Sequence, residues 1–207
     1  IAATKAGIFR RNAFAVIAPQ EAAPGLVLQD RAERAGARPY VGGQDFAIHE
    51  EHGRLVYQDQ DGLLDLPTPR LKGRHQHVNA ATAIATLRCV FGASFPVAAI
   101  ERGLQSVEWP ARLQRLHGAL LAHVPRDAEL WLDGGHNEDG ARALAAAIGE
   151  MEEKAPRPLV LVLGLMARKD AAAILEPFRG LAQEIYAVDI PDSTVARKAE
   201  DLAATAR

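Results

Sequence analysis

The stretch from residue 130 to residue 151 reads LWLDGGHNEDGARALAAAIGEM and holds a strand, a tight turn and a helix in direct succession. Its first four residues predict a buried strand that ends at Asp133. Two glycines then allow a sharp turn, and Asn137 is a favourable N-cap for a helix predicted over 138–151. The segment therefore places Asp133, His136 and Asn137 at one turn, where a strand ends and a helix begins.

Two interpretations of this turn stay open on spacing alone. In the first, it is a well-capped loop, and Glu138 and Asp139 in the first helical turn already complement the helix dipole. In the second, free backbone N–H groups at the helix start bind an anion, and His136 donates to a phosphate or a carboxylate. The second interpretation gains support because ligands of open α/β sheets bind at the carboxyl ends of the strands.

Apolar strands alternate with helices through the second half of the chain. The predicted strands are 129–133, 158–164 and 184–190, and the predicted helices are 138–151, 170–181 and a final one that begins at 193. This alternation predicts an α/β fold with a mostly parallel, Rossmann-like sheet. Asp133, Gly164 and Asp189 would then lie at the carboxyl edge of that sheet.

The first half shows a different order of elements. We predict a strand, a helix, a small antiparallel ribbon of three strands and two further helices, over residues 14–18, 25–35, 46–50, 54–58, 63–67, 75–91 and 96–104. Residues 105–110 (QSVEWP) then resemble a hinge or a domain boundary.

Composition narrows the class of protein. The chain has 207 residues, of which 48% are hydrophobic, and a formal net charge of −2. That charge gives no reason to expect nucleic acid or an acidic membrane surface, and no apolar run is long enough to span a bilayer. The lone Cys89 excludes an internal disulfide framework and favours a reducing, cytoplasmic setting. Because the sequence begins without Met and stops within a helical pattern, we expect a piece of a longer protein.

Three further places carry candidate binding residues. Gln76 and Asn79 are three apart on one helix face, and their amides suit the edge of a purine, although they also suit simple capping and solvation of the first turn. Arg112 follows the hinge and can clamp phosphate oxygens in a bidentate manner, although an exposed arginine is more often a solvated surface residue. Lys5 alone reads as a surface lysine. The phosphate-loop pattern GxxxxGK[ST] is absent from the sequence.

Five motifs in order resemble one family. KAGIF (5–9), GRHQHVNAATAIATL (73–87), WPARLQRL (109–116), LWLDGGHN (130–137) and VLGLMARKD (162–170) are similar to the folylpolyglutamate synthase/dihydrofolate synthase family of the Mur ligase superfamily. The resemblance implies the end of a P-loop-type ATPase domain over 1–106. It implies a Rossmann-like glutamate ligase domain, truncated, over 107–207. The phosphate loop and most of the folate site would precede Ile1.

The resemblance also implies an activity. Enzymes of this family are ATP-dependent ligases that activate a carboxylate of dihydropteroate or folate as an acyl phosphate, which the amino group of L-glutamate attacks. ATP and Mg2+ are the implied cofactors, a monomer is expected, and the isolated chain is expected to be inactive. Two alternatives stay open: a Mur-type ligase of cell-wall precursors, which tends to carry Asn in place of Gln76, and a non-catalytic nucleotide-binding module.

Residue roles follow from the same resemblance. Lys5 matches a lysine that is carbamylated in the family, and a carbamate can ligate magnesium. Gln76 and Asn79 match amides near the adenine, and Arg112 matches an interdomain arginine that reaches the ATP phosphates. Asp133 and His136 match residues that the C-terminal domain brings to the active site.

The chain departs from the family pattern at some positions. Thr4 stands where the family usually has Glu, which weakens the assignment of Lys5. In the family's DGAHNP motif, Gly135 replaces Ala and Glu138 replaces Pro, and both changes leave the Asp and the His in place. Asp170 matches the aspartate of a DKD-like motif, for which the sequence suggests no definite role.

Overall fold

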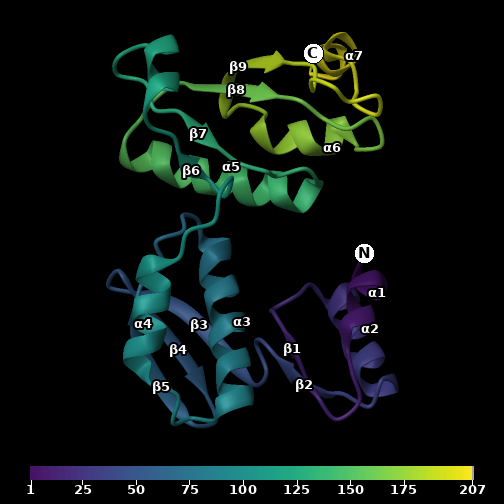
Figure 1. Cartoon of the computed structure of the whole chain (residues 1–207), viewed down its shortest axis with the longest axis vertical. Coiled ribbons are helices and arrows are strands. Elements are labelled where there is room, and N and C mark those ends of the chain that lie inside the picture. Colours follow the sequence, from purple (N-terminus) through teal and green to yellow (C-terminus); the bar gives the residue numbers. More distant parts are fainter. Residues whose placement is uncertain (207) are drawn as a thin grey trace. The chain divides into compact units, whose positions relative to one another are not determined.

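The computed structural model describes residues 1–206, which form two compact units, the first Ile1–Glu108 and the second beginning at Trp109 (Figure 1). The division between the units falls inside the 105–110 stretch in which the sequence predicts a hinge. Among the described residues, no helix has the length and apolar character needed to cross a bilayer.

The first unit opens with a small parallel pair of strands flanked by helices. In chain order these are α1 (Ala2–Lys5), the 3-10 helix η1 (Ala6–Ile8), β1 (Phe14–Ile17), α2 (Ala22–Arg34) and β2 (Arg38–Val41). β1 and β2 pair in parallel. The predicted strand and helix are present, and α2 begins three residues earlier than expected. β2 was not predicted, because Pro39 within it is untypical of strands.

Gly42 directly follows β2, in a position that a larger residue could not occupy. A Cβ there would lie 2.4 Å from Cδ of Pro19, which follows β1. The Gly42 N–H donates to the Ile17 carbonyl over 2.8 Å. The close approach of the two strand ends therefore explains the glycine.

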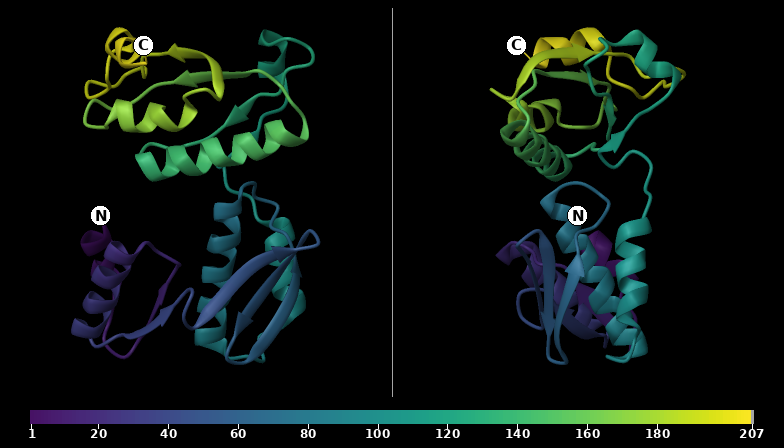
Figure 2. Two further views of the ribbon diagram at one scale, coloured as in Figure 1. Left: turned by 180° about the vertical axis from the view of Figure 1, so that it is seen from behind. Right: turned by 90° about the vertical axis from the view of Figure 1, so that its left-hand side faces the viewer.

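An antiparallel sheet makes up the rest of the first unit, as the sequence predicts. β3 (Phe46–Glu51), β4 (Arg54–Asp59) and β5 (Gly62–Pro67) pair in that order. The helices α3 (Arg74–Phe91) and α4 (Val97–Ser106) cover one face of this sheet (Figure 2). The core between them is closed by Leu55, Tyr57, Leu66, Ala81 and Ile84.

A row of aromatic rings connects the two sheets of the first unit. Ring centroids lie 6.5 Å apart for Phe14 and Tyr40, 5.6 Å for Tyr40 and Phe46, and 6.1 Å for Phe46 and Tyr57. Offset stacks and edge contacts at such distances add stability beyond the apolar area they bury. The row therefore joins the parallel pair to the antiparallel sheet.

A buried ion pair joins β4 to α3. The Asp59 carboxylate accepts hydrogen bonds from Nε and Nη2 of Arg88 over 2.7 Å and 3.0 Å, and the Tyr57 hydroxyl donates to it over 3.1 Å. The Asp59 and Arg88 side chains are only 1% and 8% exposed. Breaking such a pair strongly lowers stability, because removing one partner leaves the other charge buried without a counter-charge.

Arg88→Met is expected to lower the free energy of unfolding of this chain by about 3–5 kcal/mol, since it leaves the buried Asp59 charge without its partner. Arg54→Met is the matched control, because Arg54 pairs with Asp65 on the surface of the same sheet, where both side chains are about half exposed. The control is expected to lose about 1 kcal/mol or less. Urea unfolding of both variants measures the difference, and equal losses would contradict the account of Asp59.

The same network makes stability depend on alkaline pH. Burial, reinforced by the negative charge of Asp59, raises the pKa of Tyr40 to about 12, and burial and Asp59 also raise the pKa of Tyr57. The folded protein thus keeps protons that unfolded tyrosines release near pH 10. The contribution of these raised pKa values to the free energy of unfolding is fully present below about pH 10. It is lost as the pH rises through about 12.

We therefore expect the free energy of unfolding to fall between about pH 10 and pH 12, and to fall less in Tyr57→Phe. Urea unfolding across this range provides the measurement. If the free energy of unfolding fell as steeply with pH in Tyr57→Phe as in the wild type, a contribution from Tyr57 would be contradicted.

The second unit is a mixed α/β fold, which confirms the predicted class. Its elements are β6 (Gln114–Arg115), η2 (Ala119–His123), β7 (Trp131–Leu132), α5 (Glu138–Lys154), β8 (Leu159–Leu163), α6 (Ala171–Leu175), η3 (Glu176–Phe178), β9 (Ala182–Ala187) and α7 (Ala199–Thr205). β8 and β9 pair in parallel, as predicted. β7 pairs instead with β6, antiparallel and in a separate sheet, so the prediction that Asp133 shares one parallel sheet edge with Gly164 and Asp189 is wrong.

Several boundaries differ from the prediction: α5 continues to Lys154 rather than ending at 151, and β9 spans Ala182–Ala187 rather than 184–190. The strand expected over 129–133 is reduced to β7, and the helix expected over 170–181 is divided into α6 and η3, because Pro177 has no N–H to continue the helix. The last helix begins at Ala199 rather than at 193. Residues 193–198 instead run along the loop that follows β8, with a bridge between Met166 and Ala196.

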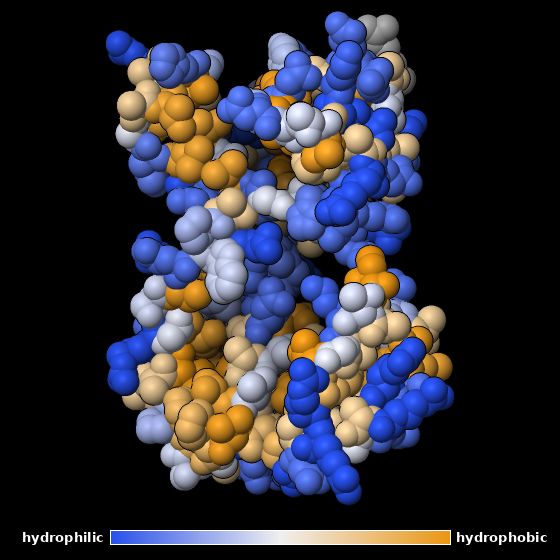
Figure 3. Space-filling view, turned by 45° about the vertical axis from the view of Figure 1, so that its right-hand side comes forward, coloured by the Kyte–Doolittle hydropathy of each residue, from blue (hydrophilic) through white to orange (hydrophobic). Residues whose placement is uncertain are grey.

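β8 alternates between the core and the surface. Leu159, Leu161 and Leu163 pack against the core formed with α5, α6 and α7, whereas Val160 and Val162 are 50% and 62% exposed. Exposed apolar side chains also occur in the first unit, and Figure 3 shows them in orange among blue polar residues.

Candidate functional site

The turn that carries Arg112 is strained. Ala111 and Leu113, on either side of it, have φ values of 55° and 40°, although neither is a glycine. Such left-handed conformations cost a non-glycine residue about 1–2 kcal/mol. The Leu113 side chain is buried, whereas Arg112 is exposed. The strained backbone thus turns Arg112 outward while its neighbour anchors the turn in the interior.

Asp133 binds that turn from the other side of the site. Its Oδ2 accepts the Leu113 N–H over 2.7 Å, and its Oδ1 accepts the Gly135 N–H over 2.7 Å. The Gly134 N–H in turn donates to the Ala111 carbonyl over 2.9 Å. One carboxylate therefore connects two turns that lie 20 residues apart in the sequence.

The two glycines fit this close contact. A Cβ on Gly135 would lie 3.0 Å from Oδ1 of Asp133, and one on Gly134 would lie 3.4 Å from the Ala111 carbonyl oxygen and 3.8 Å from Nη1 of Arg112. The last distance places the Arg112 guanidinium beside the glycine turn. Arg112 and Asp133, both predicted site residues, thus come together.

His136 and Asn137 complete the turn. The Asn137 side chain accepts the Gly140 N–H over 2.8 Å, which confirms the predicted N-cap of α5. Nδ1 of His136 lies 2.9 Å from the Gly134 carbonyl oxygen. Because a carbonyl only accepts, Nδ1 must carry a proton, and the neutral ring then has its acceptor at Nε2. The His136 side chain is exposed.

Gln76 and Asn79 lie in the first unit, in the first turns of α3. Nδ2 of Asn79 donates to Oε1 of Gln76 over 3.0 Å, and Nε2 of Gln76 lies 2.9 Å from Nε2 of His75. Gln76 is only 5% exposed. The simple interpretation that both amides solvate the helix start therefore does not describe Gln76, whose side chain orients Asn79 at the surface.

Lys5 lies at the end of α1, exposed, in the first unit. An unmodified ammonium offers only donors, so it cannot ligate a cation. Within residues 1–206, no group of three or more His, Cys, Asp or Glu side chains is arranged to hold a metal ion.

The loop after β8 is held by contacts that the sequence did not reveal. Nη2 of Arg197 donates to the carbonyls of Ala167 and Lys169, over 3.2 Å and 3.1 Å. Asp170, whose role the sequence left open, caps α6 by accepting the Ala173 N–H over 3.1 Å. These contacts fix the VLGLMARKD segment at the carboxyl end of its strand.

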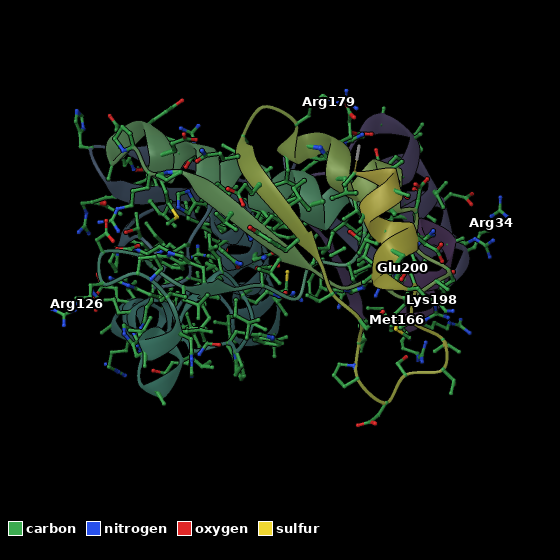
Figure 4. The ribbon with its side chains drawn as sticks, turned by 90° about the horizontal axis from the view of Figure 1, so that it is seen from above. Arg34, Arg126, Met166, Arg179, Lys198 and Glu200 are labelled. Carbon is green, nitrogen blue, oxygen red and sulfur yellow. The ribbon has the colours of Figure 1, made fainter. Side chains whose placement is uncertain are left out.

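A hollow of about 400 Å3 lies beside the start of α7, lined by Asp189, Lys198, Ala199 and Glu200. Figure 4 shows Lys198 and Glu200 at this helix start. Oδ1 of Asp189 already accepts the Ala199 N–H over 2.9 Å. The side chains that line the hollow thus carry charges of both signs, and Asp189 among them already accepts a hydrogen bond from the first turn of α7.

Sequence reasoning missed two participants in the Arg112 turn. Oε1 of Gln114 accepts the Ala111 N–H over 3.0 Å, and the strained Leu113 presents its N–H to Asp133. No local signal marks either residue, because a positive φ is usually announced by glycine or asparagine.

Comparison with known proteins defines the class first. Residues 111–207 match the family described as "Mur ligase, glutamate ligase domain". This match begins at the strained turn and covers β6 through α7. The second unit is therefore a glutamate ligase domain of the Mur ligase type.

Relatives of the whole chain define the family. The chain is 30% identical over 203 residues to the folylpolyglutamate synthase of Lacticaseibacillus casei, covering 92% of this chain and 44% of that protein. It is 33% identical over 192 residues to the dihydrofolate synthase/folylpolyglutamate synthase of Mycobacterium tuberculosis, covering 84% and 37%. The chain belongs to the folylpolyglutamate synthase/dihydrofolate synthase family, as the motif order predicts, and spans less than half the length of these relatives.

Solved structures agree with this assignment. E. coli FolC in complex with DHPP and ADP has a TM-score of 0.81 at 26% identity, over 99% of this chain and 45% of that one. A bifunctional folylpolyglutamate synthase/dihydrofolate synthase with Mn, AMPPNP and L-glutamate bound has a TM-score of 0.79 at 25% identity, over 99% and 45%.

Proposed function

We propose that this chain is the C-terminal portion of an ATP-dependent ligase that adds L-glutamate to dihydropteroate, to folate, or to both. In this proposal residues 1–106 end an ATPase domain and residues 107–207 form the glutamate ligase domain. The observation that carries it is the joining of the Arg112 turn to the Asp133–His136 turn within a domain of the glutamate ligase type. The length of the relatives supports a longer parent enzyme.

The proposed reaction has two steps. A carboxylate oxygen of the folate substrate attacks the γ-phosphorus of ATP, which releases ADP and leaves an acyl phosphate. The glutamate amino group then attacks the acyl carbon, expels inorganic phosphate and forms the amide. Such phosphoryl transfer depends mainly on positioned charges and donors.

Residues of this chain would serve each step. Arg112, turned outward, would bind phosphate oxygens in a bidentate manner, and Nε2 of His136 would accept the proton that the attacking amine loses. Gln76 and Asn79 would bind the adenine edge. Asp133 was predicted as catalytic, and both of its oxygens already accept backbone N–H groups.

Magnesium is proposed as the cation that accompanies ATP, and when bound it would neutralise phosphate charge. Lys5 would take part only as its carbamate, whose oxygens, unlike an ammonium, can ligate a cation. Mass spectrometry of the intact protein, prepared with and without bicarbonate, would detect that carbamate as a labile adduct.

The direct test uses the full-length protein that contains this chain. It is incubated with ATP, Mg2+, labelled L-glutamate and, in separate reactions, dihydropteroate, a reduced folate or a cell-wall precursor. We expect label in the folate reactions alone. Incorporation into the cell-wall precursor would favour a Mur-type ligase, and nucleotide binding without incorporation would favour a non-catalytic module. The 207-residue chain alone, which lacks the phosphate-loop pattern, is expected to add no glutamate.

We propose a monomeric enzyme of the cytoplasm that binds small molecules rather than nucleic acid. Size-exclusion chromatography of the full-length protein would test the monomer.

A further inference from the structure

Both oxygens of the Asp133 carboxylate accept hydrogen bonds from the backbone of its own domain. Each oxygen accepts one N–H over 2.7 Å, from Leu113 and from Gly135. Leu113 adjoins Arg112 in sequence, and Gly135 adjoins His136. The two side chains proposed to act on phosphate and amine therefore sit next to the two ends of a single carboxylate bridge.

The Arg112 turn needs such a restraint. The two left-handed conformations that flank Arg112, at Ala111 and Leu113, together cost a few kcal/mol and persist only when surrounding contacts hold them. Three hydrogen bonds hold this turn. The Leu113 N–H donates to Asp133, the Gly134 N–H donates to the Ala111 carbonyl, and the Ala111 N–H donates to Gln114. Asp133 contributes the charge-assisted bond among these three, which is the strongest kind.

We propose that Asp133 is a positioning residue: it holds the strained Arg112 turn against the His136 turn and acts in ligation through Arg112. This inference rests on the proposed function of Arg112. It follows that most of the effect of losing the Asp133 carboxylate depends on the presence of Arg112.

A double-mutant cycle in the full-length protein tests this. Asp133→Asn keeps the size of the side chain but replaces one acceptor by a donor, which opposes one of the two N–H groups. We expect kcat/KM for glutamate addition to fall about 10- to 100-fold, as for other misplaced catalytic groups. In an Arg112→Ala background the same change should cost about threefold or less, since coupled residues are not additive.

A rescue experiment separates positioning from general structural damage. Glycine adopts positive φ without strain, so Ala111→Gly should restore part of the activity of Asp133→Asn by removing one cause of the strain. An equal fold-loss in both Arg112 backgrounds, with no rescue by Ala111→Gly, would show that the carboxylate acts by itself and would overturn the proposal.

Two additions keep the test decisive. If Asp133→Asn does not fold, Gln114→Met serves in its place, because it removes another hydrogen bond of the Arg112 turn from an exposed position. Its smaller loss of kcat/KM should likewise disappear in the Arg112→Ala background. A loss of the same size in that background would contradict the proposal. The same cycle is measured on the Kd for ADP by calorimetry. Absence of wild-type glutamate addition would contradict the proposed function, while the ADP cycle would still decide whether Asp133 acts through Arg112.

Discussion

Arg112→Ala is expected to lower kcat/KM for glutamate addition by the full-length enzyme about 10²- to 10³-fold, with the fold unchanged. Positioned donors that stabilise charge developing in a transition state have effects of this size. The Arg112 side chain is exposed, while Leu113 beside it provides the buried anchor, so removing the guanidinium leaves the core intact. Steady-state kinetics, together with thermal unfolding, provide the measurement.

Arg126→Ala is the matched control for this prediction. Arg126 is an exposed arginine of the same unit, in the segment that follows η2, and Figure 4 marks its position. We expect its turnover to stay within about twofold of the wild type, because exposed charges away from a site have small effects. Similar losses in the two variants, or near-normal turnover in Arg112→Ala, would remove Arg112 from the site.

His136→Ala is expected to lower kcat about 10²-fold or more, with a smaller change in KM, since general bases contribute in this range. The Nδ1 proton is committed to the Gly134 carbonyl, so Nε2 is the nitrogen that can accept a proton from the attacking amine. As the pH rises, more of the free glutamate carries a neutral amine, and the deficit of the variant should narrow.

His123→Ala is the control for His136, because His123 is exposed at the end of η2 in the same unit. It should behave as the wild type at every pH. A deficit in His136→Ala that stays constant with pH would contradict proton transfer and would leave His136 a binding role.

The local elements of this fold could be predicted because their signals are local. A strand that ends in Asp133, a glycine turn and a capping Asn137 are all legible in one stretch, and the structure places α5 where that stretch predicts it. The antiparallel ribbon was also predictable, since its turns and alternation lie within 22 residues, Phe46–Pro67.

What could not be predicted depends on tertiary contacts. Nothing in the sequence around Leu113 announces a positive φ, because the restraint comes from Asp133, 20 residues further along the chain. The pairing of β2 with β1 likewise overrides the presence of Pro39. The late start of α7 has a similar cause: residues 193–198 bond instead to the loop that follows β8, through Ala167 and Arg197.

The central claim is amide ligation through an acyl phosphate, and oxygen transfer tests it most directly. The substrate carboxylate is labelled with 18O, and the full-length enzyme is allowed to turn over with ATP, Mg2+ and L-glutamate. One carboxylate oxygen should leave with inorganic phosphate and the other should stay in the amide, so we predict one 18O in phosphate for each amide formed. Unlabelled phosphate, or label in AMP, would contradict the mechanism.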